Sequence, residues 1–64
     1  MINIHHQIDY INQELEKYRT AYDISLNSLI DGNKGMLPVI VLIQNTIDNL
    51  QSIKISLETL KNID

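Results

Sequence analysis

The sequence predicts an all-α protein, a two-helix antiparallel hairpin that packs like a coiled coil. Apolar residues recur at steps of three and four along both halves of the 64-residue chain, which places them on one face of a helix. A single break, from Gly32 to Gly35, separates the two patterns. The two halves also have similar lengths, as a hairpin requires.

The first helix is expected to run from about Ile4 to about Ile30. Asn3 is suited to cap it, because its side-chain oxygen can accept from a backbone N–H one turn later. The apolar stripe of this helix consists of Ile4, Ile8, Ile11, Leu15, Tyr18 and Tyr22. The heptad steps would continue at Ser25, but the next apolar residues are Leu26 and Leu29. This shift predicts a local relaxation of the left-handed supercoil.

Residues 31–35 form the expected turn, and Gly32 is suited to the left-handed conformation that closes a helix. The second helix is expected over about residues 36–62, because Pro38 is tolerated in a first turn, where N–H groups have no helical partner. One core row of this helix is Met36, Ile43, Leu50 and Leu57, and the other is Val39, Thr46, Ile53 and Leu60. The β-branched run 39–43 also suits a strand, but no second strand is available to pair with it.

A two-helix hairpin has one seam, which buries too little surface to offset the entropy of ordering the whole chain. Residues 1–64 therefore form a single helical-hairpin domain that oligomerisation or a partner is expected to complete into a helical bundle. We expect the partner to be a second copy of the chain, another helical protein, or both.

Composition argues against several other functions. The formal net charge is −3, with five Lys and Arg scattered along the chain, so we expect no nucleic-acid binding. The longest apolar run, Met36 to Ile43, contains Pro38 and is far shorter than the roughly 20 residues of a membrane span. The N-terminus lacks the flanks of a signal peptide. These features predict a cytoplasmic protein, with export expected only for a secretion-apparatus component.

No residues suggest catalysis, a metal site or a cofactor. His5 and His6 point about 100° apart on a helix, so they cannot chelate together, and His5 with Asp9 supplies only two ligands. The carboxylates Glu14 and Glu58 lie at helical spacing from lysines, which is typical of surface ion pairs. The two glycines match no phosphate-binding loop. We therefore expect a non-enzymatic protein.

The candidate interface residues are two tyrosines and the apolar run that opens the second helix. They are Tyr18, Tyr22, Met36, Leu37, Ile40, Val41, Leu42, Ile43, Ile47 and Leu50. A helix that is apolar all round must be covered on more than one side. Together with Ile24 and Ile30, the run predicts an association surface at the turn end; the alternative is a compact local core. The tyrosines suit either an intramolecular seam or an interface, because their hydroxyls must reach water or a partner group.

The second half of the chain resembles the small helical hairpins of bacterial type III secretion systems. Leu26-Asn27-Ser28 precedes the turn, Met36-Leu37 opens the second helix, Gln44 follows, and Leu57-Glu58-Thr59-Leu60-Lys61-Asn62-Ile63 closes it, as in some needle subunits. The absence of a proline at the turn and of a tail after the last helix counts against a filament. The chain is also similar in outline to the acidic hairpin co-chaperones that keep needle subunits monomeric.

Two functions follow as expectations. The first is an association module that acts by helix packing, either with itself or as a small chaperone or adaptor; the resemblance implies a needle subunit or its co-chaperone. The second is a small regulator, encoded by a phage or mobile element, that blocks a host protein by laying one helix in a groove.

Overall fold

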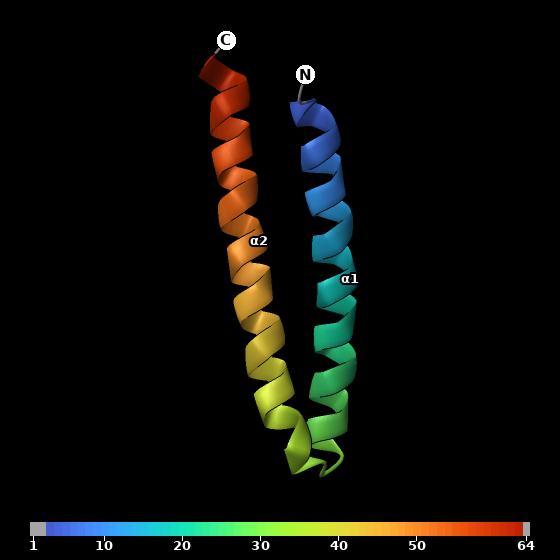
Figure 1. The fold of residues 1–64 in the computed structure, drawn as a ribbon. Helices are drawn as coiled ribbons and strands as arrows, with labels where there is room; N and C mark the ends of the chain where they lie inside the picture. The colour runs from blue at the N-terminus through green and yellow to red at the C-terminus, as the bar shows by residue number, and fades with distance from the viewer. Residues whose placement is uncertain (1–2, 64) are drawn as a thin grey trace.

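The computed structural model describes residues 3–63, and it confirms a hairpin of two long helices (Figure 1). Helix α1 spans Ile4–Ile30, a 3₁₀ turn η1 spans Lys34–Met36, and helix α2 spans Leu37–Ile63. No strand occurs between residues 3 and 63. The molecule is a rod of 50 × 15 × 14 Å, and both ends of the chain lie at the end opposite the turn.

Both ends of α1 have the stabilising features that the sequence predicts. The side-chain oxygen of Asn3 accepts a hydrogen bond from the backbone N–H of His6 at 3.2 Å, which satisfies one of the unpaired donors of the first turn. At the other end, Gly32 has a φ of 109°. Its N–H donates to the carbonyl oxygen of Leu29 at 3.0 Å. A residue with a Cβ would be strained at this φ, so glycine is what lets the chain turn here.

The chain enters α2 through η1 rather than directly. The N–H of Met36 donates to the carbonyl of Asn33 at 3.1 Å, and the Asn33 side-chain amide donates to the Ser28 hydroxyl at 3.4 Å. The first residue of α2 is therefore Leu37, one position later than expected, and Pro38 follows it in the first turn.

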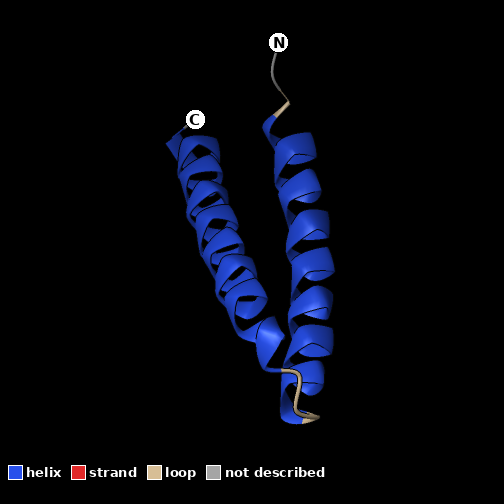
Figure 2. Cartoon of the chain, turned by 60° about the horizontal axis from the view of Figure 1, so that its bottom comes forward, coloured by secondary structure: helices blue, strands red, loops and turns tan. Residues whose placement is uncertain are grey.

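One seam holds the two helices together. Its centre consists of Ile11, Leu15 and Ile47, with exposed fractions of 8%, 2% and 7%. The side chains packed around this centre are Tyr18, Tyr22, Ile43, Leu50 and Leu57. The part of the predicted first-helix stripe from Ile11 to Tyr22 thus lies in the seam, and Ile4 and Ile8 are half-buried. The helices diverge toward their free ends (Figure 2), and the most deeply buried side chain, Leu15, lies near the middle of α1.

The structure corrects one of the two core rows predicted for the second helix. Ile40 and Ile47 are buried. Each lies one residue after a position of the predicted core row that begins at Val39, and the two face the seam in place of that row. We call that earlier row the outer row: Val39, Thr46, Ile53 and Leu60. Its three aliphatic side chains are 38% to 53% exposed. The sequence pattern favours the outer row because the row of Ile40 continues into Lys54 and Lys61. A lysine can nevertheless lay its methylene stem along the edge of a seam. Lys54 is half-buried.

A second correction concerns the end of α1. Ser25 is buried at 6% exposure, whereas Leu26 and Leu29 are only half-buried. The heptad steps therefore continue through Ser25, and the shift expected there is wrong. A small side chain at this position suits the close approach of the helices near the turn, where a leucine would need more room.

Candidate interaction surface

The seam leaves many large apolar side chains exposed. Among the residues that the structure describes, only four hydrophobic residues are buried: Ile11, Leu15, Ile40 and Ile47. Eleven are exposed: Tyr10, Ile24, Ile30, Leu37, Val39, Val41, Leu42, Ile53, Ile55, Leu60 and Ile63. Scattered exposed leucines are ordinary in proteins, but a contiguous group marks an association surface. Their arrangement on the helices therefore decides their meaning.

The ten interface candidates from the sequence divide into two groups. Those along the seam, buried or half-buried, are Tyr18, Tyr22, Met36, Ile40, Ile43, Ile47 and Leu50. Those exposed to solvent are Leu37, Val41 and Leu42. Both tyrosines pack against the core, and the Lys17 ammonium lies 5.9 Å from the centroid of the Tyr18 ring. The structure thus places the tyrosines in the intramolecular seam.

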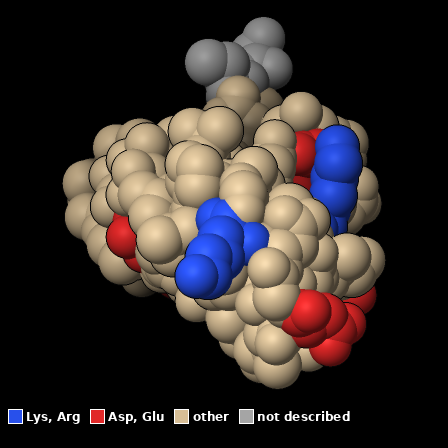
Figure 3. All heavy atoms as spheres, turned by 90° about the horizontal axis from the view of Figure 1, so that it is seen from below, with Lys and Arg blue, Asp and Glu red and all other residues tan. Residues whose placement is uncertain are grey.

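The turn end carries exposed aliphatic side chains on several sides. Ile24, Ile30 and Leu42 have exposed fractions of 65%, 72% and 66%. Seen from this end, a few charged side chains are separated by wide areas of uncharged surface (Figure 3). Exposed apolar residues are not confined to this end, however, because Leu60 and Ile63 lie at the far end of α2.

The exposed apolar residues of α2 form a second stripe beside the seam. It combines the outer row with the next row around the helix: Val39, Leu42, Thr46, Asn49, Ile53, Ser56, Leu60 and Ile63. Steps of three and four alternate along this set, which is the spacing of a coiled-coil seam. Five of its members are large and apolar, with exposed fractions from 38% to 72%. Sequence reasoning missed this stripe because it assigned the outer row to the interior.

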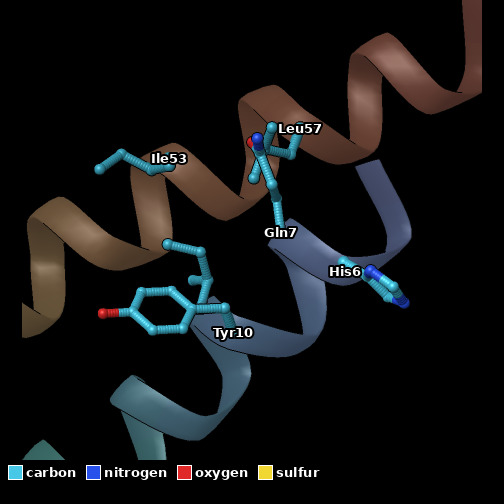
Figure 4. A pocket seen from close by; sticks show the side chains of 6 residues that line it. His6, Gln7, Tyr10, Ile53 and Leu57 are labelled. Carbon is cyan, nitrogen blue, oxygen red and sulfur yellow. The ribbon is translucent and has the colours of Figure 1, made fainter. Parts of the chain in front are cut away.

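A groove of about 370 Å³ lies between the second stripe and the first helix, near the free ends. Its lining residues are His6, Gln7, Tyr10, Ile11, Ile53 and Leu57. Gln7 extends toward Leu57, and the ring of Tyr10 lies along the side that Ile53 borders (Figure 4). The groove lies where the two helices diverge (Figure 2). It joins α1 and the second stripe into one surface.

Charged residues are absent from the second stripe. The four charged side chains of α2 are Asp48, Lys54, Glu58 and Lys61, and none lies at a stripe position. Lys54 and Glu58 pair at 3.9 Å, and Asp48 accepts a hydrogen bond from the Gln44 amide at 3.0 Å. The charged side chains of α2 therefore lie off the second stripe, and Lys54 and Lys61 continue the row of Ile40 and Ile47.

Residues 3–63 contain no group of three or more His, Cys, Asp or Glu side chains arranged to hold a metal ion. Within the same range, no helix combines the length and apolar character that crossing a membrane requires.

Comparison of the chain with models of protein families, with curated proteins and with solved structures finds no match.

Proposed function

We propose that this protein is a non-enzymatic association module, in which the helical hairpin binds another protein surface by helix packing. The observation that carries the proposal is the number of large apolar side chains left exposed, eleven in residues 3–63, where only four apolar residues are fully buried. An isolated hairpin of this size has little stability to spare. Covering its apolar exterior adds hydrophobic stabilisation of about 25 cal/mol for each Å² removed from water.

The arrangement of the exposed residues supports helix packing rather than a loop or pocket interaction. The second stripe has coiled-coil spacing along nearly the whole of α2. A helix in a partner could therefore lie along it with side chains interdigitating, as in bundles and coiled coils. The groove beside Tyr10 offers a position for one protruding side chain.

The most concrete form of the proposal is a role in a type III secretion apparatus, as needle subunit or needle co-chaperone. Its support is the sequence resemblance over residues 26–63, together with the hairpin outline of two 27-residue helices.

Affinity purification from the native host, with mass spectrometry, tests the association. The control is a variant in which Leu42, Ile53 and Leu60 are serine. We expect the natural chain to self-associate or to retain a specific protein that the variant loses. A chain that stays monomeric, melts at a temperature independent of its concentration, and retains nothing beyond what the variant retains would refute the proposal.

A further inference from the structure

We propose that the second stripe of α2 binds the second stripe of another copy of this chain, antiparallel, so that two hairpins close a four-helix bundle. The inference deepens the proposed function, on which it rests, by naming the surface and its occupant. Three features support it: the area left exposed, the absence of charge from the stripe, and the way the stripe matches itself when reversed.

The exposed area is larger than a compact chain of this mass requires. The chain of 7.4 kDa exposes 4943 Å², whereas a compact monomer of that mass exposes about 4,200 Å². The excess is about 700 Å², close to the roughly 800 Å² that each partner contributes to a stable interface of standard size. Burying one face of the hairpin against a second copy would remove about as much accessible surface as this excess.

The absence of charge favours a second copy over a different protein. In a two-fold dimer, a residue near the axis meets its own equivalent, so any charge there meets a like charge. The chain is acidic, with a net charge of −3, yet all eight stripe positions are uncharged. A stripe without charges also offers nothing for a partner of opposite charge to recognise.

On the α1 side of the same face, the charged side chain is that of Lys17, and it is paired with a carboxylate. Tyr10, Lys17 and Ile24 share one heptad row, and Tyr10 lines the groove together with Ile53, so this row lies on the side of the second stripe. Lys17 pairs with Glu14 at 3.9 Å. Its neighbours in the row, Tyr10 and Ile24, are 62% and 65% exposed. These two side chains widen the apolar face beyond α2.

The stripe matches itself when one copy is reversed. Aliphatic residues occupy its two ends, Val39 with Leu42 at one and Leu60 with Ile63 at the other. With the two-fold axis level with residue 51, Val39 lies opposite Ile63 of the second copy, and Leu42 lies opposite Leu60 of the second copy. In an antiparallel coiled coil, each layer pairs a residue from one core row of the first helix with a residue from the other core row of the second helix. Each aliphatic end is therefore covered by the aliphatic end of the other chain.

The middle of the stripe is polar and fixes the register. In the same arrangement, Thr46 lies opposite Ser56 of the second copy, and Asn49 lies opposite Ile53 of the second copy. A shift by one heptad in one direction sets Thr46 opposite Ile63 and Asn49 opposite Leu60, and a shift in the other direction sets Ser56 opposite Val39. Either shift leaves the aliphatic side chains at one end of each stripe uncovered. Polar residues at core positions reduce stability but select one register.

The structure provides a matched pair of variants for the test. Leu42 and Leu60 lie on the stripe and are 66% and 53% exposed; Ile55 and Val41 lie on the other side of α2 and are 65% and 53% exposed. Sedimentation equilibrium compares the natural chain with the Leu42→Ser/Leu60→Ser variant and with the Val41→Ser/Ile55→Ser variant. We expect a dimer for the natural chain, a dissociation constant raised about 100-fold or more by the stripe substitutions, and one within about threefold of the natural value for the other pair.

Cysteine cross-linking tests the antiparallel register without removing the stripe. The natural chain has no cysteine, so Leu42→Cys and Leu60→Cys chains each carry one thiol. We expect a disulfide only when the two variants are mixed, joining position 42 of one chain to position 60 of the other. Disulfide dimers of either variant alone would show a parallel pair and refute the inference.

The outcomes separate the inference from the proposed function. A natural chain that is monomeric but binds a different protein refutes the second copy and leaves the association module standing. A dimer weakened by the Val41→Ser/Ile55→Ser variant, and not by the stripe variant, refutes the surface. A dimer with the expected variant effects and the mixed disulfide supports both.

Discussion

Shortening Leu15 to alanine tests the seam on which the whole fold depends. Leu15 is the most deeply buried side chain of the described chain, at 2% exposure, and it lies at the centre of the core with Ile11 and Ile47. Removing it from a well-packed core loses its transfer free energy and leaves a cavity, together about 3 kcal/mol. Stabilities of about 0.05 to 0.15 kcal/mol per residue give the chain about 3 to 10 kcal/mol in total.

The expected result is a large drop in melting temperature. In a domain of this size, each kcal/mol shifts the midpoint by about 4 to 8 °C, so we expect Leu15→Ala to melt about 12 to 24 °C lower. Circular dichroism at 222 nm, at one fixed protein concentration, measures the shift. The control is Ile55→Ala: Ile55 is 65% exposed, and alanine improves helix propensity there, so its midpoint should stay within a few degrees.

Two results would refute the description of the seam. If Leu15→Ala melts within a few degrees of the natural chain, this side chain is not buried between the helices in solution. If Ile55→Ala is as damaging as Leu15→Ala, α2 is rotated about its axis relative to the structure described here.

Three further substitutions test the turn, the cap and the seam of α2 by the same melting assay. Gly32→Ala should destabilise the chain by about 1 to 2 kcal/mol because Gly32 has a φ of 109°. The control, Gly35→Ala, adds a Cβ that meets only the Asn33 side chain and should cost less than half as much. Equal effects would show that no left-handed residue closes α1. Asn3→Ala should cost about 1 kcal/mol by removing the bond to the His6 N–H, and no change would show that the cap does not persist in solution. Leu50→Asp should abolish the cooperative transition by placing a carboxylate beside the core. The control, Gln51→Asp at the exposed neighbouring position, should melt near the temperature of the natural chain. A cooperative melt of Leu50→Asp would place Leu50 outside the seam.

The sequence predicted the elements of this fold well because their signals are local. A capping asparagine, an apolar stripe at helical spacing, and a glycine after the last turn each act within a few residues. Asn3, the stripe from Ile11 to Tyr22, and Gly32 accordingly have the roles expected of them.

The rotation of α2 about its own axis was not predictable from such local signals. Two apolar rows, one containing Val39 and the other Ile40, flank the row from Met36 to Leu57, and both satisfy a heptad pattern. In the structure, the row with Ile40 and Ile47 is the buried one. The row with Ile53 has three aliphatic residues, whereas the row with Ile40 has two and ends in Lys54 and Lys61, although Lys54 is half-buried. The same error hid the exposed stripe, because Val39, Ile53 and Leu60 were predicted to lie in the interior.

The way the two helices are joined determines how the molecule opens. They are linked only by the short connection after Ile30, and they diverge away from it. Separating them breaks the seam one layer at a time from the free ends, while the layers near Ser25 and Ile40 are held by the turn and open last. Amide protons in the seam should therefore exchange with solvent fastest near Ile4 and Leu57 and slowest toward the turn. Opening of this kind would separate the helices at their free ends while the short connection after Ile30 keeps them together at the turn.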